Sequence, residues 1–175
     1  MNSRTLKKFV EIVSERLTGE WVVIGGTVLP ILGVDHRVTL DLDFIRIREK
    51  EGSSDSLILM EIAEQIGLPI EAVNQAGAYF FSKVENANDH LVILRKGSKC
   101  TIYRPDVWLY IALKLGRFTE TDLEDCLFMI KHLEEEFQRQ QADIIQLIQG
   151  KLKASKSGRD EWLSRVRELL NRCQK

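Results

Sequence analysis

Residues 21–32 read WVVIGGTVLPIL, and residues 37–44 read RVTLDLDF. The first four of these residues are β-branched or aromatic and stop at Gly25 and Gly26, which predicts a strand buried on both faces. Glycines after such a strand let the backbone approach a phosphate closely, and the N–H groups that open a helix are oriented toward anions. Residues 27–32 are apolar and predict that helix, with a proline in its first turn. The alternative, a simple turn, is the more common use of a lone glycine pair.

The second segment alternates apolar and polar side chains over residues 37–47, which is the period of a β-strand. Asp41 and Asp43 are therefore expected on one face, close enough to hold a divalent cation between their carboxylates. Adjacent like charges repel each other on a half-buried strand, so a structural role alone does not favour the arrangement. The alternative is a solvent-facing edge strand that happens to carry two acids.

The rest of the chain predicts an α+β fold, a mixed β-sheet flanked by helices and followed by a C-terminal helical region. The boundary divides residues 1–104 from residues 105–175, and we expect the helical region to pack on the core. In the first part, the patterns predict helices at 3–17 and 55–66 (capped at 52–55) and strands at 78–84, 90–95 and 99–103. In the second part, they predict helices at 106–115, 119–133, 142–152 and 161–170, with a polar linker at 153–159.

Composition excludes several classes of protein. The chain has 175 residues, of which 44% are hydrophobic and 29% charged, so disorder and a fibrous fold are not expected. The longest uncharged run, residues 21–34, is shorter than the roughly 20 residues of a membrane-spanning helix. No secretory leader is evident, and three distant cysteines (Cys100, Cys126 and Cys173) fit reduced thiols, so we expect a cytoplasmic protein. A net charge of −1 argues against a dedicated nucleic-acid coat.

The glycine pair followed by Asp-Leu-Asp resembles the signature of the nucleotidyltransferase superfamily. More narrowly, it is similar to the minimal, AbiEii-like toxin-type nucleotidyltransferases of bacteria, in which Arg and Ser or Thr precede Asp-Leu-Asp. A second block supports this resemblance, since a helix ends in ALKLGR at 112–117 and DLED follows at 122–125. The resemblance covers residues 22–131 and implies a nucleotidyltransferase-like sheet.

The resemblance implies a metal site. Asp41 and Asp43 would be catalytic residues that ligate Mg²⁺ or Mn²⁺, and the cation would bridge the phosphates of the nucleotide. Asp122 would be either the third acidic group or a residue that supports the other two. Many nucleotidyltransferases carry a third carboxylate on a later strand, whereas the strands predicted between residues 78 and 103 hold no acid.

The resemblance also implies a nucleotide site. Gly25, Gly26 and Thr27 would lie against the triphosphate, with the threonine hydroxyl as a donor. Lys114 would be a catalytic residue that pairs with a phosphate oxygen as a point charge. Arg37 would help to bind the nucleotide or orient the aspartate strand, and its alternative is a surface position.

The leading hypothesis is a metal-dependent transferase that moves a nucleoside monophosphate from an NTP, such as ATP, to an acceptor. The acceptor would be an RNA (possibly a tRNA), a protein hydroxyl or a small molecule. The alternative is a catalytically degenerate fold that acts as a binding or regulatory module of a toxin–antitoxin type system. A cognate antitoxin or a second copy of the chain would then be its partner. A metal-dependent phosphohydrolase is a third, minor option.

The net charge hides two opposite regions in the helical part of the chain. Residues 119–149 hold eight acids and two bases, whereas residues 151–175 hold eight bases and three acids. The basic end is predicted to contact a phosphate backbone or an acidic helix, and the alternative is an ordinary solvated helix.

Overall fold

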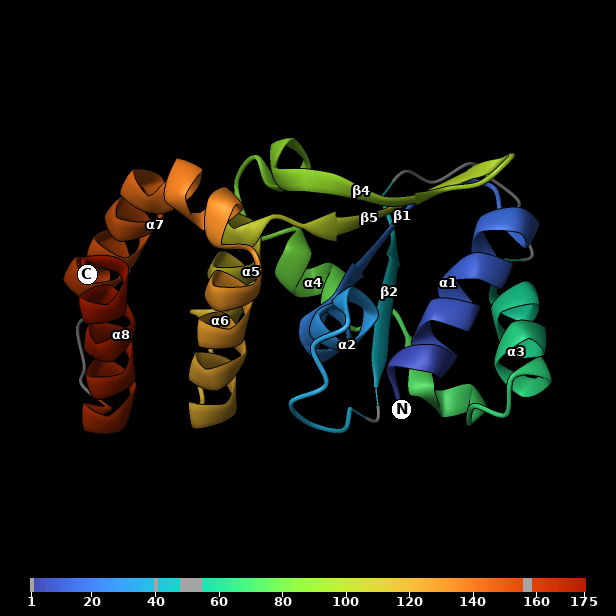
Figure 1. Cartoon of the computed structure of the whole chain (residues 1–175), viewed down its shortest axis with the longest axis horizontal. Helices are drawn as coiled ribbons and strands as arrows, with labels where there is room; N and C mark the ends of the chain where they lie inside the picture. Colours follow the sequence, from blue (N-terminus) through green and yellow to red (C-terminus); the bar gives the residue numbers. More distant parts are fainter. Residues whose placement is uncertain (1, 40, 48–54, 156–158) are drawn as a thin grey trace. The chain divides into compact units, whose positions relative to one another are not determined.

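The computed structural model describes residues 2–39, 41–47, 55–155 and 159–175. It consists of two compact units (Figure 1). The N-terminal unit spans Met1–Pro105 and the helical unit spans Asp106–Lys175, so the division falls one residue after the predicted boundary. The class is α+β with a mixed five-stranded sheet flanked by helices, as the sequence predicts at this level.

The sheet of the N-terminal unit has the strand order β3-β2-β1-β5-β4. Strand β1 is parallel to β5 and antiparallel to β2; β3 is parallel to β2, and β4 is antiparallel to β5. This places β1, the predicted fully buried strand, at the centre. The strands are β1 (Gly19–Ile24), β2 (Leu42–Arg46), β3 (Val73–Asn74), β4 (Leu91–Lys96) and β5 (Cys100–Pro105).

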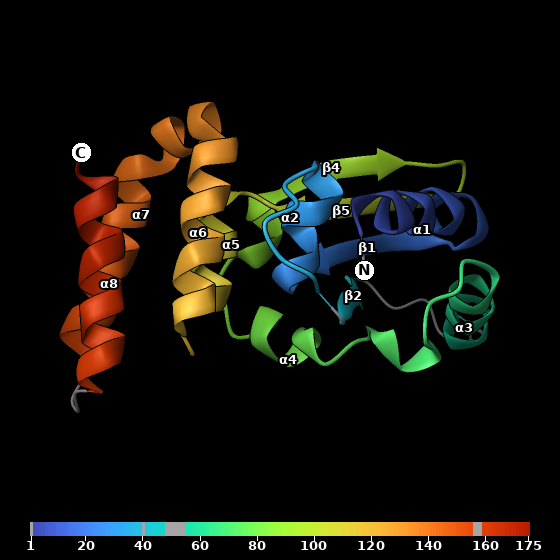
Figure 2. The same ribbon diagram turned by 60° about the horizontal axis from the view of Figure 1, so that its bottom comes forward.

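Helix α1 (Ser3–Arg16) supplies much of the core beneath this sheet. Phe9 of α1 packs edge-on against Phe44 of β2, with 5.6 Å between ring centres, and Trp21 of β1 stacks on the same ring at 4.8 Å. The helix is capped by Asn2, whose side chain accepts from a backbone N–H of the first turn. Helix α3 (Asp55–Gln65) lies beside α1 (Figures 1 and 2). The predicted start of α3 at residues 52–54 lies outside the described part of the chain.

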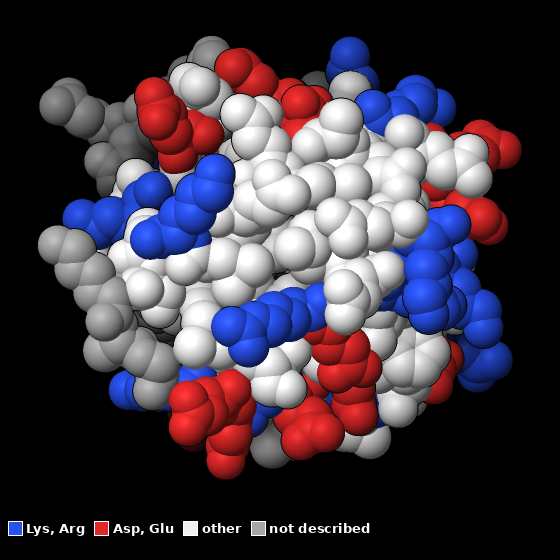
Figure 3. Space-filling view, turned by 90° about the vertical axis from the view of Figure 1, so that its left-hand side faces the viewer, with Lys and Arg blue, Asp and Glu red and all other residues white. Residues whose placement is uncertain are grey.

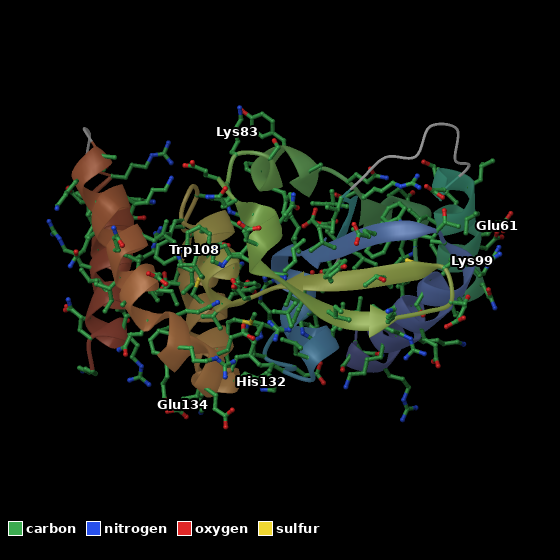
Figure 4. The ribbon with its side chains drawn as sticks, turned by 90° about the horizontal axis from the view of Figure 1, so that it is seen from above. Glu61, Lys83, Lys99, Trp108, His132 and Glu134 are labelled. Carbon is green, nitrogen blue, oxygen red and sulfur yellow. The ribbon has the colours of Figure 1, made fainter. Side chains whose placement is uncertain are left out.

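Two expectations about strands are wrong. Residues 78–84 form no strand, because helix α4 (Gly77–Phe81) occupies this place. Tyr79 and Phe80 of this segment are exposed, and Lys83 projects over the Tyr79 ring at 5.1 Å from its centre (Figure 4). The strand predicted from residue 37 begins only at Leu42, and Val38 is 74% exposed. Strand β1 ends at Ile24, so its ladder with β2 stops at Asp43, and Leu42, the first residue of β2, is paired with Val73 of β3 instead.

The helical unit contains α5 (Val107–Lys114), α6 (Glu120–His132), α7 (Glu134–Ala154) and α8 (Asp160–Cys173). Asp106 caps α5, and Thr119 caps α6. Helix α7 begins eight residues earlier than its apolar stripe indicates, because three glutamates stabilise its first turn. Helices α7 and α8 lie side by side (Figures 1 and 2).

The expectations about membrane-spanning helices and about the cysteines can be compared with this fold. Among the described residues, no helix has the length and apolar character needed to cross a membrane. The three cysteines form no disulfide and all are buried. Burial raises the pKa of Cys100 and of Cys173 to about 11, so both thiols stay protonated at neutral pH.

Candidate functional site

The glycine pair stands where the sequence predicts it, between a buried strand and a short helix. Strand β1 ends at Ile24, residues Gly25–Thr27 form a 3₁₀ turn, and α2 (Val28–Leu32) follows. Gly25 has a φ of +72°, a left-handed conformation that residues with a side chain rarely adopt. Thr27 is fully buried, and its hydroxyl donates to the Ile24 carbonyl at 3.0 Å. That side chain therefore stabilises the turn itself, rather than presenting its hydroxyl at the surface.

The Asp43 carboxylate lies against Gly25. The antiparallel ladder pairs Asp43 with Ile24, one residue before the turn. A β-carbon placed on Gly25 would stand 2.5 Å from Asp43 Oδ2, closer than non-bonded atoms approach. The flanking residues Leu42 and Phe44 are fully buried, whereas Asp43 is half-buried. The predicted alternation therefore holds here, and it aims Asp43 at the glycine turn and away from the core.

The Arg37 guanidinium lies against the second glycine of the same turn. A β-carbon on Gly26 would stand 2.4 Å from a terminal nitrogen of Arg37. The structure thus brings a carboxylate and a guanidinium, separated by six residues in the sequence, to adjacent glycines. A guanidinium offers planar donors that match phosphate oxygens, and a carboxylate is a ligand that Mg²⁺ prefers. Together they give the turn both kinds of group that a metal–phosphate complex requires.

Asp41 is exposed and lies just before β2, outside the ladder. The buried Thr39 holds this segment, since its hydroxyl donates to the Asp41 carbonyl at 3.1 Å. Residue 40, between them, lies outside the described residues. Asp43 therefore lies within β2, whereas Asp41 lies just outside it, so strand geometry does not place the two aspartates on one face.

Sequence reasoning missed Asn74, which is paired with Asp43, and helix α4, which packs on the same face of the sheet. Asn74 of β3 is paired with Asp43 in a parallel register, so the two side chains leave the same face of the sheet. The Asn74 Oδ1 accepts from the backbone N–H of Ala76 at 3.0 Å. Helix α4 packs on that face as well, because a β-carbon on Gly77 would stand 2.5 Å from the side chain of Ile24. A strand of two residues has no readable period, and no other signal in the sequence marks Asn74.

Lys114 and Asp122, the remaining predicted site residues, belong to the helical unit and contact each other. The Lys114 ammonium lies 3.1 Å from Asp122 Oδ1 and 2.6 Å from Asp125 Oδ2. All three side chains are buried, with exposed fractions of 8%, 1% and 0%. The role of Asp125 as a second partner of Lys114 was not predicted from the sequence. Lys114 and Asp125 are 11 residues apart and belong to different helices, so no helical spacing in the sequence predicts their ion pair.

Asp122 also has a capping role at the start of α6. Its carboxylate accepts from Arg117 Nε at 2.9 Å and from the Thr119 backbone N–H at 3.0 Å. In return, the Thr119 hydroxyl oxygen accepts from the backbone N–H of Asp122 at 3.3 Å. Burial raises the pKa of Asp122, but the bonds from Arg117, the charge of Lys114 and the Thr119 N–H outweigh burial and hold that pKa well below its usual range. The structure thus accounts for Asp122 and Lys114 by a capping box and a buried ion pair.

A third carboxylate beside Asp43 is absent from the described strands. Strands β4 and β5 carry no acid. Glu20 of β1 faces the same side as Ile24, but four strand positions separate the two by about 13 Å. The Glu20 carboxylate instead accepts from the Tyr103 hydroxyl at 3.1 Å. Among the described residues, no group of three or more His, Cys, Asp and Glu side chains is arranged to hold a metal ion.

Comparisons of the chain with protein-family models, with curated proteins and with solved structures give no significant match. The relation to nucleotidyltransferases therefore stays a prediction. Its support lies in the contacts among Gly25, Gly26, Arg37 and Asp43.

Proposed function

We propose that the chain is a Mg²⁺- or Mn²⁺-dependent nucleotidyltransferase with a nucleotidyltransferase-like sheet. It transfers a nucleoside monophosphate from an NTP to a hydroxyl of an RNA, a protein or a small molecule. One observation carries the proposal: the Asp43 carboxylate and the Arg37 guanidinium lie against the two glycines that join a buried strand to a helix. A turn used only to reverse the chain needs neither charge beside its glycines.

The donor set fits a divalent cation that is shared with a phosphate. Mg²⁺ is usually held by one or two carboxylates together with phosphate oxygens, and Asp43 with Asp41 at the strand entrance supplies such a pair. When bound there, the cation would neutralise charge on the phosphates as a Lewis acid. Arg37 would donate to the non-bridging phosphate oxygens from its position against Gly26.

Asn74 adds a neutral donor beside this pair. Its Oδ1 accepts from the Ala76 N–H, so toward a group bound next to Asp43 it would act as a donor through its amide nitrogen. Thr27, Lys114 and Asp122 are not part of this proposed site. Their polar atoms take part in the turn and in the buried ion pair described above.

The second candidate is a binding module that holds a metal–nucleotide complex without transferring it. The observation in its favour is the missing third carboxylate, since β4 and β5 carry no acid among their described residues. Such a module would still need Asp43 and Arg37. The two candidates therefore share a site and differ in turnover.

The test uses each of the four NTPs labelled on the α-phosphate, with Mg²⁺ or Mn²⁺ and an acceptor panel of RNA, protein and small molecules. We expect transfer by the natural chain, its loss in Asp41→Asn/Asp43→Asn, and its retention in the exposed control variant Asp89→Asn. Transfer that survives the double substitution would overturn the mechanism. Calorimetry separates the candidates, because tight metal-dependent NTP binding without transfer supports the binding module, and no NTP binding contradicts both.

A further inference from the structure

A second site of a different kind lies within the helical unit. A pocket of about 410 Å³ opens where the turn after α5, the end of α7 and the start of α8 meet. Its polar lining comes mainly from Arg117, Lys151 and Arg159, and its aromatic wall is Trp162. No acidic side chain is among its described lining residues. The volume is within the range of about 300–1,000 Å³ that is typical of small-molecule sites.

The three cations contribute in different ways. Arg117 is 74% exposed and is bonded to Asp122 through Nε and one terminal nitrogen, each at 2.9 Å. That carboxylate balances the Arg117 charge and fixes the orientation of its guanidinium. Lys151 and Arg159 are exposed, and they supply the net positive charge of the pocket. A pre-oriented guanidinium beside two solvated cations is suited to an anion with several oxygen atoms.

The aromatic wall is fixed as well. The indole N–H of Trp162 donates to the Leu115 carbonyl at 3.2 Å, and Arg165 donates to the Phe118 carbonyl at 3.0 Å. These two bonds attach α8 to the turn that carries Arg117. The Trp162 ring is therefore held at the pocket independently of any ligand. A fixed aromatic ring next to cations matches a ligand that combines a flat ring with a phosphate.

We propose that this pocket binds a nucleotide, with its phosphate against Arg117, Lys151 and Arg159 and its base stacked on Trp162. The nucleotide is either free or part of an RNA strand. Two of the cations of the basic end, Lys151 and Arg159, thus take part in one site together with Arg117. On the face shown in Figure 3, the Lys and Arg side chains form separate groups and do not make one continuous basic surface. The proposal does not depend on the site at Gly25 and Asp43.

The test measures binding to the full chain in EDTA, which removes any metal-dependent contribution from the other site. A fluorescein-labelled hexaribonucleotide is titrated by anisotropy, and AMP and ATP are titrated by calorimetry. Binding of AMP or ATP at the pocket indicates a free nucleotide, and binding of the hexamer alone indicates a strand. Asp41→Asn/Asp43→Asn must leave this binding unchanged, so that failure here and failure of the transferase are distinguishable.

Charge and stacking are tested by separate variants. Removing two phosphate contacts with Lys151→Gln/Arg159→Gln should lower hexamer affinity about 20-fold at 0.1 M salt and reduce the salt slope by about 1.4. The matched control is Arg167→Gln/Lys175→Gln, two exposed cations of the same unit that do not line the pocket. Its affinity should stay within about twofold. An equal loss in the control would overturn the proposal in favour of a diffuse electrostatic surface.

Stacking is tested by comparing two substitutions of the tryptophan. Trp162→Leu should lower affinity about tenfold, whereas Trp162→Phe keeps a ring and should lose less. Both variants lose the indole bond to Leu115, so an equal loss in the two would mean that the ring acts on the fold, and base stacking would be refuted. A poly-glutamate peptide of equal charge serves as the competitor. If it displaces the hexamer, and if substitution of Trp162 does not change hexamer affinity, the pocket would be assigned to an acidic protein segment instead.

Discussion

Gly25 and Gly67 form a matched pair that separates backbone strain from function. Both glycines have a φ of +72°, but the space around them differs. A β-carbon on Gly25 would lie 2.5 Å from Asp43 Oδ2, whereas a β-carbon on Gly67, just after α3, would meet no atom within 4 Å. Substituting alanine at each position therefore introduces the same strain, and only one of the two substitutions disturbs the Asp43 carboxylate.

The expected energies follow from these contacts. Alanine in the left-handed region costs about 1–2 kcal/mol, and reduced freedom of the unfolded chain returns about 0.4–1 kcal/mol. Each variant should thus lose about 1 kcal/mol of unfolding free energy. The contact at Gly25 adds little, because the offending atom is the end of the Asp43 side chain and the Cγ and Cβ atoms of that residue remain 3.5 and 3.7 Å away. Rotation of the carboxylate relieves the clash and moves the proposed metal ligand.

The measurements are urea unfolding followed by far-UV circular dichroism, and calorimetry of each NTP with Mg²⁺. We expect Gly25→Ala and Gly67→Ala to unfold within about 0.5 kcal/mol of each other. Metal-dependent NTP binding should fall more than tenfold in Gly25→Ala and remain unchanged in Gly67→Ala. Equal binding by the two variants would show that the Asp43–Gly25 contact has no part in binding. A stability loss confined to Gly25→Ala would show that the contact supports the fold.

Three further predictions concern the helical unit and the thiols. Lys114→Met leaves two buried carboxylates without their ammonium, so the unfolding free energy should fall by about 3 kcal/mol, and a change within about 0.5 kcal/mol would contradict the buried ion pair. The pKa of Asp122 is lowered in the folded state, so its stabilisation is complete above the ordinary carboxyl pKa and is lost as pH falls below about 4; urea unfolding between pH 6 and pH 2.5 should show a shallower dependence for Asp122→Asn. Ellman's reagent at pH 8 should react slowly with the native chain and fully after denaturation, and fast native reaction would contradict the buried positions of Cys100, Cys126 and Cys173.

The predictable part of the fold is the part whose cause is local. The strand, glycine turn and short helix of residues 21–32 follow from consecutive residues, and the structure confirms their order and place. The start of β2 was not predictable, because it depends on pairing with the distant strands β1 and β3. Residues 78–84 were mispredicted for a related reason. Aromatic side chains favour strands, yet Gly77 packs α4 onto Ile24 across the sheet face, and that contact is not local.

The candidate site likewise has a part that is predictable from local sequence and a part that depends on contacts between distant residues. The period of two alone places Asp43 on the face opposite to the buried Leu42 and Phe44, but its contact with Gly25 depends on the register between β1 and β2. The approach of Arg37 to Gly26 required the fold of the connection between α2 and β2, so only a resemblance suggested it. Asn74 reaches Asp43 through a parallel register that no spacing in the sequence encodes.

Lys114 and Asp122 show why charge in a sequence is ambiguous evidence of a site. The sequence looks the same whether a charged side chain of a helix faces a ligand or is buried in an ion pair. Burial distinguishes them, because an isolated buried charge costs several kcal/mol and must be matched by a partner. Asp125 is that partner, fully buried and 2.6 Å from the Lys114 ammonium. Arg117 is the contrasting case, since it is bonded to the buried Asp122 yet 74% exposed at a pocket without acidic lining, which makes it the member of the cluster best placed to meet a ligand.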